Sequence, residues 1–168
     1  MLKIAITGPE CSGKTTLCTS LSNHFNVPYI PEYARLFLEG KDQHYNQTDL
    51  DLIAMGQINS LQTFQNSPLI SDTDFCVLEI WSHYKYQNVS DLIQELVAKY
   101  FFDLHILCTP DIPWVFDKLR ENPNSRMYLF DLYKATLLRH NKNFIIVNGA
   151  HSKRVEKSIQ VIEEYINI

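Results

Sequence analysis

The feature that most constrains how this chain can fold is the stretch GPECSGKT at residues 8–15, which directly follows the apolar run LKIAIT at residues 2–7. The stretch matches the pattern G-x-x-x-x-G-K-[ST] in full. In such a loop the backbone N–H groups and the start of the next helix face the same phosphate groups, which requires a strand before the loop and a helix after it. The stretch therefore predicts a buried strand, a phosphate-binding loop and a helix from Lys14 to about His24.

The residue types in this loop each suit a part of nucleoside-triphosphate binding. The glycines allow the backbone to wrap around the phosphates, and Lys14 is expected to reach the β- and γ-phosphates. The hydroxyl of Thr15 is expected to bind Mg²⁺. For Cys11 we expect the backbone N–H, rather than the thiol, to matter. The residues of this loop that are predicted to bind ATP are Gly8, Glu10, Cys11, Ser12, Gly13, Lys14, Thr15 and Thr16.

Beyond the loop, apolar runs and helical patterns alternate along the chain. Further strands are predicted at residues 27–32, 67–74, 103–108 and 143–149. Helices are predicted at 33–40, from Thr48 or Asp49 onward, at 91–100 and at 153–166, with a polar loop at 41–49 and two helices in 110–140 separated by the turn ENPNS. Strands separated by helices favour right-handed crossovers. We therefore expect residues 1–168 to form a single α/β domain, with five mostly parallel strands in a three-layer α/β/α arrangement.

Composition narrows the partners of such a domain. The net charge of −4 argues against a nucleic-acid-binding protein, which usually carries a basic face. No apolar run approaches the ~18 residues of a membrane span, and the opening MLKIAIT is too short an apolar run for a signal peptide. The four cysteines show neither C-x-x-C pairing nor a histidine at metal-ligand spacing, which disfavours a zinc site. We expect a cytoplasmic protein with small-molecule partners, and no particular oligomeric state is predicted.

Three acidic residues stand where two of the predicted strands end, which is the edge at which open α/β sheets bind ligands. Asp72 follows the apolar run LIS, as a Mg²⁺-linked acid does, and Glu32 ends the second strand. Phosphoryl transfer to a hydroxyl needs one acid linked to the metal and one that orients the hydroxyl and accepts its proton. We favour Asp72 for the metal and Glu32 for the acceptor, although the sequence also allows the reverse. Asp74 is expected to point to the same side as Asp72, and it fits a surface acid equally well.

The arginines suggest a lid. Arg120 and Arg126 flank the polar turn ENPNS, where a closing segment would place guanidinium groups on the transferring phosphoryl group. The rival interpretation is a pair of solvated arginines at helix ends. Arg35 follows Glu32 by three residues, and it either binds the substrate or pairs with Glu32 or Glu39.

Several other residues stand at the expected ligand edge. Trp114 follows the fourth predicted strand and either stacks on a substrate ring, with a preference for a cationic pyridinium, or packs in the core. Gly149 and Arg154 follow the last strand, and we expect them to meet the adenine, with Arg154 as a stacking plane. A second aromatic cluster, formed by Trp81, Tyr84 and Tyr86, fits a cleft or, more commonly, a core.

The loop is shared by several classes of protein, and the sequence separates them. A GTPase switch needs D-x-x-G, yet none of the five glycines has an aspartate three residues before it. The guanine motif N-K-x-D is also missing, because NKNF at 141–144 ends in phenylalanine. A motor or remodelling ATPase would need a second domain or oligomerisation helices. A small kinase remains the interpretation that fits best.

Taken together, the motifs resemble the ribosylnicotinamide kinase domain of bacterial NadR proteins and stand-alone AAA-type ATP-binding relatives of that domain. The likeness covers residues 3–154 and is carried by GPECSGKTTL, PEYARLFLEG, YNQTDLDLIAMGQI, LISDTDF, FDLHILCTPDIPWVFDKLR and RMYLFDLYKATLL. The loop motif is shared with many nucleotide-binding proteins, whereas PEYAR, DTD and PDIPW in this order are more specific. In that family DTDF is followed by a threonine-rich stretch that borders the acceptor pocket, and here CVLEIW stands in its place.

The resemblance implies a P-loop kinase fold with a short arginine-bearing lid, ATP and Mg²⁺ as co-substrate, and transfer of phosphate to the 5′-hydroxyl of nicotinamide riboside. On this basis Lys14, Glu32, Asp72, Arg120 and Arg126 are expected to serve catalysis, and Thr15 and Asp72 to hold the metal. The substrate-binding set is Glu32, Arg35, Asp72, Asp74 and Trp114. Other nucleosides or nucleoside monophosphates, the latter clamped by Arg35, remain alternative acceptors. A non-catalytic ATP-sensing module is the alternative from another class.

Overall fold

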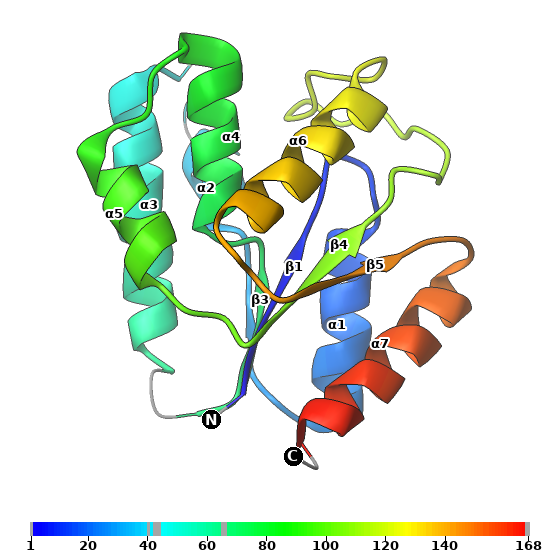
Figure 1. Cartoon of the computed structure of the whole chain (residues 1–168). Coiled ribbons are helices and arrows are strands. Elements are labelled where there is room, and N and C mark those ends of the chain that lie inside the picture. The colour runs from blue at the N-terminus through cyan, green and yellow to red at the C-terminus, as the bar shows by residue number, and fades with distance from the viewer. Residues whose placement is uncertain (1, 40, 42–44, 65–66, 167–168) are drawn as a thin grey trace.

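A computed structural model describes residues 2–39, 41, 45–64 and 67–166 of the chain (Figure 1). Its centre is a sheet of five strands, in which every neighbouring pair is parallel. In spatial order the strands are β2 (Tyr29–Ile30), β3 (Leu69–Asp72), β1 (Lys3–Thr7), β4 (Leu104–Cys108) and β5 (Phe144–Val147). The strand that leads into the phosphate loop, β1, therefore lies in the middle of the sheet.

Helices cover both faces of the sheet, which confirms the expected three-layer arrangement (Figure 1). One face carries α1 (Lys14–Phe25) and α7 (His151–Ile166). The other face carries α3 (Gln47–Gln62), α4 (Phe75–Tyr86), α5 (Asp91–Lys99) and α6 (Arg126–Arg139), with the short α2 (Tyr33–Glu39) packed on α3. In the described parts of the chain, none of these helices is both long and apolar enough to cross a membrane.

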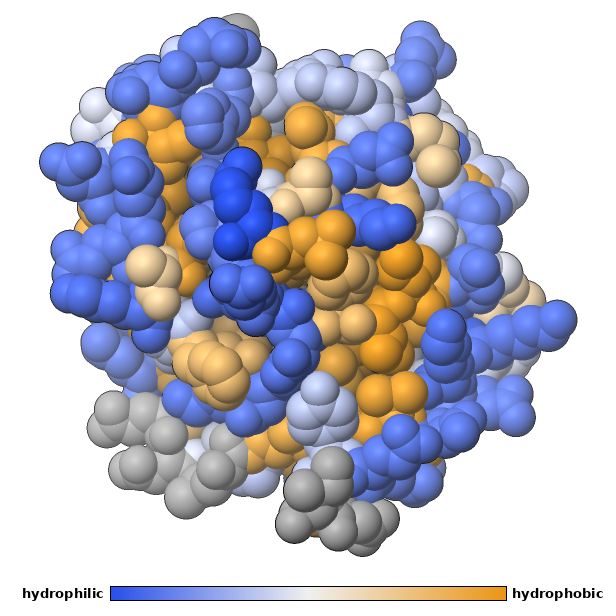
Figure 2. Space-filling model, viewed as in Figure 1, coloured by the Kyte–Doolittle hydropathy of each residue, from blue (hydrophilic) through white to orange (hydrophobic). Residues whose placement is uncertain are grey.

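Two apolar cores, one on each face, explain why the strands are continuous apolar runs. Side chains of a strand alternate between the two faces, so that Ile4 and Ile6 of β1 pack under α1 and α7, whereas Ala5 belongs to the core under the other helices. The edge strand β5 is less covered, because Phe144, Ile145 and Ile146 are only half-buried. Figure 2 shows apolar surface in this region, between α6 and α7.

Residues 110–140 differ from the expectation of two helices. The second helix is present as α6, but residues 109–125, which we name the lid segment, contain no helix. Pro110 and Pro113 lack the backbone N–H that a helix needs. The carbonyl of Val115 instead accepts a hydrogen bond from Arg120 Nη1 at 2.6 Å. The segment is therefore held by side-chain contacts.

Two further features were not foreseen. No element is predicted for residues 75–86, which contain α4. This helix is buried at every position from Phe75 to Ile80, so its sequence lacks the amphipathic period that marks a surface helix. The helix α3 is capped by Asn46 in a capping box with Asp49 at its third position, not by Thr48 or Asp49 as expected. The predicted end of the second helix, Gly40, lies outside the described residues.

Candidate active site

The phosphate loop lies between β1 and α1, as the motif predicts, and its backbone depends on glycine. Gly8 has φ 137°, and a Cβ atom there would lie 2.6 Å from the carbonyl oxygen of Cys108 on the neighbouring β4. Gly13 has φ 82° and directly precedes α1. Because positive φ is unfavourable for other residues and the space beside Gly8 is filled by backbone, no larger residue fits there without moving β4.

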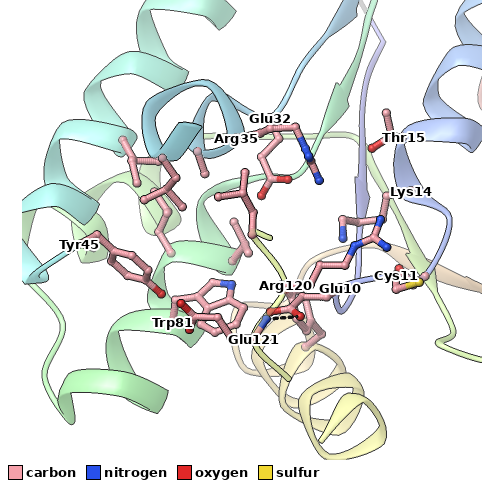
Figure 3. Close-up of a pocket in the computed structure, with 18 of the residues that line it drawn as sticks. Glu10, Cys11, Lys14, Thr15, Glu32, Arg35, Tyr45, Trp81, Arg120 and Glu121 are labelled. Carbon is pink, nitrogen blue, oxygen red and sulfur yellow. Dashed lines mark hydrogen bonds between the residues drawn. The ribbon is translucent and has the colours of Figure 1, made fainter. Parts of the chain in front are cut away.

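Inside the loop, two side chains bind the same carbonyl. Ser12 Oγ donates to the oxygen of Pro9 at 2.8 Å, and Lys14 Nζ donates to it at 2.9 Å. These bonds close the loop into a curve and hold the ammonium group of Lys14 across it. Lys14, Thr15 and Thr16 line a pocket that opens beside the loop (Figure 3).

The hydroxyl of Thr15 meets the acid at the end of β3. Thr15 Oγ1 donates to Asp72 Oδ2 at 2.6 Å, and the hydroxyl of Tyr29 approaches the same oxygen at 3.4 Å. Asp72 is 1% exposed, and within the described residues its Oδ1 has no hydrogen-bond partner. A buried carboxylate oxygen without a partner is costly, and a carboxylate beside a hydroxyl suits Mg²⁺, which usually keeps several water ligands. Thr15 and Asp72 therefore fit the magnesium ion that the loop implies.

Asp74 does not share this side of the sheet, so the expectation that it points the same way as Asp72 is wrong. Thr73 between them has φ 73°, in the left-handed region, which breaks the alternation of an extended strand. Asp74 is 4% exposed, and its Oδ2 pairs with Nε2 of the fully buried His105 at 2.9 Å. Burial alone would raise the pKa of Asp74, but the hydrogen bond and charge of His105 outweigh burial and keep that pKa below its usual range.

Glu32 lies two residues after β2 and reaches into the pocket (Figure 3). Its pKa is raised, mainly because the carboxylate is withdrawn from water. The charge of Lys14 lowers this pKa, and the charge of Asp72 raises it. A carboxylate with a raised pKa takes up a proton more readily near neutral pH, which suits a general base.

The lid segment contributes Leu119, Arg120 and Glu121 to the lining of the pocket. Arg126, the first residue of α6, is not among the described lining residues and donates from Nη1 to the carbonyls of Cys11 at 3.2 Å and Ile112 at 3.0 Å. Arg35 pairs with Asp117 of this segment at 3.1 Å, and not with Glu32 or Glu39, the two partners the sequence suggested. The structure therefore brings Arg35 and Arg120 to the pocket and uses Arg126 to brace the loop.

Away from the loop the pocket becomes apolar and aromatic. Trp81 lines it and, unlike the rest of its cluster, belongs to the cleft. Trp114 lies outside the lining that the described residues define, and its ring lies 5.6 Å from the guanidinium carbon of Arg126. The other apolar or aromatic lining residues are Ala34, Leu38, Tyr45, Leu50, Ile53, Val77, Leu78, Leu119 and Tyr133. None of these residues was predicted from the sequence as part of the site, because they come from separate elements and carry no local pattern.

Arg154 lies behind the phosphate loop, not at an open surface. Its guanidinium donates to the carbonyls of Ser12 at 2.7 Å, Gly149 at 2.8 Å and Thr109 at 3.1 Å, and it also pairs with Asp111. The residue is 2% exposed, which leaves no open face on which an adenine could stack. Arg154 therefore supports the phosphate loop through hydrogen bonds to backbone carbonyls, whereas the sequence predicted that its guanidinium would stack on the adenine. Gly149, with φ 77°, donates its N–H to Asp111 Oδ2 at 2.6 Å.

Comparison with known proteins gives consistent relatives. A family model described as an AAA domain matches residues 3–154. The trifunctional NAD biosynthesis/regulator protein NadR of Salmonella typhimurium is 31% identical over 171 residues, covering 96% of this chain and 42% of NadR. NadR of Escherichia coli is 30% identical with the same coverage. The chain thus spans less than half the length of these curated relatives.

Solved structures show the same fold. A NadR protein in complex with NAD and AMP-PNP has a TM-score of 0.82 at 21% identity, covering 99% of this chain and 50% of that one. A NadR protein in complex with NR has a TM-score of 0.79 at 20% identity, covering 99% and 52%. Thymidylate kinase from Ehrlichia chaffeensis has a TM-score of 0.67 at 15% identity, covering 96% and 98%. These likenesses confirm the expected kinase-like P-loop fold.

Proposed function

The chain belongs to this AAA-domain family, and on that premise we propose that it is an ATP-dependent kinase that phosphorylates the 5′-hydroxyl of nicotinamide riboside to give nicotinamide mononucleotide. The observation that carries the proposal is a single pocket with two unlike ends. One end holds Lys14 and Thr15, and the other is the aromatic recess around Trp81 and Tyr45. Glu32 lies between them (Figure 3).

The two ends suit the two substrates. The triphosphate of ATP would lie along the loop, with Thr15 and Asp72 holding Mg²⁺, which would neutralise charge on the phosphate oxygens. The flat ring of the acceptor would lie against Trp81, because an indole face attracts both aromatic rings and a cationic pyridinium. The curated relatives named for NAD biosynthesis and the neighbour solved with NR support this choice of acceptor.

The transfer step then follows from the positions of the charged groups. Glu32 orients the 5′-hydroxyl and accepts its proton, while the hydroxyl oxygen forms a bond to the γ-phosphorus. The bond between that phosphorus and the bridging oxygen breaks, and ADP leaves. Lys14 and Arg120 line the same pocket and would stabilise the negative charge on the transferred group. Aligning the acceptor between them converts a reaction of two molecules into one within a complex.

The proposal is tested by measuring ADP release from Mg-ATP with a panel of acceptors: nicotinamide riboside, the common nucleosides and their 5′-monophosphates. We expect stimulation by nicotinamide riboside and none by its 5′-phosphorylated product. Stimulation by a nucleoside monophosphate would replace the proposal with a nucleoside monophosphate kinase. ATP binding without ADP release from any acceptor would replace it with an ATP-sensing module.

A further inference from the structure

Glu10 is the one acidic residue in the loop GPECSGKT, and its carboxylate turns toward the lid segment (Figure 3). Its Oε2 accepts hydrogen bonds from the backbone N–H groups of Glu121 at 3.0 Å and Asn122 at 3.2 Å. Its Oε1 accepts a third, from the side-chain amide of Asn122, at 3.2 Å. One side chain of the phosphate loop therefore binds two consecutive residues that lie more than a hundred positions further along the chain.

These bonds act next to an arginine of the pocket. The N–H of Glu121 belongs to the peptide group that joins it to Arg120, so Glu10 holds the backbone directly beside Arg120. Arg120 has no regular element to place it, because residues 109–125 contain no helix or strand. Its position against the loop therefore depends on contacts such as those of Glu10.

The charge of Glu10 makes this contact informative. A carboxylate in an anion-binding loop repels phosphate and would weaken ATP binding if it faced the ligand. Two backbone N–H groups and an amide compensate that charge, and hydrogen bonds to a carboxylate are stronger than those between neutral groups. The loop also contacts the lid segment through Cys11, whose Sγ accepts from the N–H of Val115 at 3.3 Å and donates to the carbonyl of Pro113 at 3.4 Å. The carbonyl of Val115 in turn accepts from Arg120 Nη1 at 2.6 Å, so Glu10 holds the backbone beside Arg120 while Val115 holds its guanidinium.

We propose that Glu10 is a positioning residue that latches the lid segment to the phosphate loop and thereby holds Arg120 in the pocket. This inference rests on the proposed phosphoryl transfer for its effect on rate, but not for the latch itself. Glu10 acts through Arg120 and does not touch the transferred group. Its loss should therefore lower kcat and leave the KM for ATP nearly unchanged.

The kinetic test compares Glu10→Ala with Glu10→Gln, which keeps a hydrogen-bond acceptor. We expect Glu10→Ala to lower kcat about 10-fold to 100-fold, the loss expected for removing hydrogen bonds to a charged group, with KM for ATP within about threefold. Glu10→Gln should recover most of the rate. Glu95→Ala, which removes an exposed carboxylate on α5, is the matched control and should behave as the parent.

A second comparison separates positioning from general damage to the fold. If Glu10 acts through Arg120, then Glu10→Ala added to Arg120→Ala should cost no more than about threefold beyond Arg120→Ala alone, because contacts that share a partner are not additive. Independent losses that multiply in the double variant would overturn the proposal. Thermal unfolding of each variant shows which of them are folded. Asn122→Ala removes the side-chain amide that donates to Glu10 and should lower kcat less than Glu10→Ala does.

The contact between Glu10 and the lid segment can also be tested in the absence of an acceptor. Limited trypsin digestion cuts after Lys118 and Arg120 in the lid segment, and we expect this cleavage to be at least about fivefold faster in Glu10→Ala than in the parent and Glu95→Ala. Equal cleavage rates in all three proteins would overturn the latch. Faster cleavage in a protein that transfers no phosphate would keep the latch and reject the proposed function.

Discussion

The two ends of the pocket are built in different ways. The phosphate end comes from residues 8–16, which are consecutive, and it relies on backbone shape at Gly8 and Gly13. The acceptor end is assembled from side chains on α2, α3, α4 and α6, together with Tyr45, and it is apolar. A site made of backbone tolerates little change, whereas a wall made of side chains can be rebuilt one residue at a time. We therefore expect changes at the two ends to have separable effects, on the transfer step and on acceptor binding.

The largest effect is expected at the phosphate end. Lys14→Ala removes the ammonium group that is expected to contact the transferred phosphoryl group. Such contacts commonly contribute about 10²–10³-fold to kcat. The measurement is steady-state ADP release at saturating acceptor. The KM for the acceptor should change little, because the side chains of the acceptor end are unchanged.

The control for Lys14→Ala is Lys99→Ala, which removes an exposed lysine from a surface pair on α5. Turnover of Lys14→Ala within a few-fold of this control would contradict the assignment of the loop to transfer. A large rise in the acceptor KM would show instead that the two ends are not separable.

The next effect concerns the support of the acceptor wall. Asp74 directly precedes α4, the helix that carries Val77, Leu78 and Trp81, and its hydrogen bond ties the start of that helix to His105 of β4. Asp74→Ala leaves His105 buried without its partner, which should lower the free energy of unfolding by about 3–5 kcal/mol. Chemical denaturation measures this loss. We expect the surviving folded enzyme to show a raised acceptor KM and an ordinary KM for ATP.

The pH dependence of stability checks the same pair. Because the pKa of Asp74 is lowered in the folded state, its stabilising contribution is present above the unfolded-state value of about 3.9 and is lost as the pH falls through the lower folded-state value. Asp74→Ala should therefore lose less stability than the parent on acidification. Parallel curves for the two proteins would argue against the paired, charged Asp74.

A smaller effect is expected from the acceptor wall itself. Trp81→Ala should lower kcat/KM for nicotinamide riboside about 10-fold, in the range for loss of one stacking contact, with no change in the KM for ATP. Trp114→Ala serves as the comparison, because the sequence favoured Trp114 for this role and the pocket contains Trp81. If Trp114→Ala has the larger effect, the ring of the acceptor binds against Trp114 of the lid segment and not against Trp81.

The contrast between consecutive residues and residues from separate elements also explains which features could be predicted from the sequence. The loop was predicted correctly because its residues are consecutive. The parallel sheet was predicted correctly because each strand is a local apolar run separated from the next by a helical pattern, although the paired strands are far apart in the chain. The acceptor wall was not, since Tyr45, Leu50 and Tyr133 meet only after folding. The opposite orientation of Asp72 and Asp74 depends on one left-handed residue, Thr73, and threonine gives no signal for that conformation. The part of the lid segment before the turn ENPNS was predicted as helix. Its contacts with Cys11 and Arg35 join residues far apart in the sequence and therefore leave no local signal.

The smallest effect, and the one that joins the two ends, is the pH dependence set by Glu32. Burial raises its pKa above the ordinary 4.5, and the charge of Arg35 lowers it again in part. The base must be ionised, so kcat/KM should fall as the pH drops through this raised pKa, by up to about tenfold per pH unit. Arg35→Ala removes the lowering charge and should move the fall to higher pH, whereas Glu32→Gln should be slow at every pH and lack the fall. A pH profile that keeps the same acid limb in Glu32→Gln would assign the proton to another group, and Asp72 at the phosphate end would then be the acid to examine.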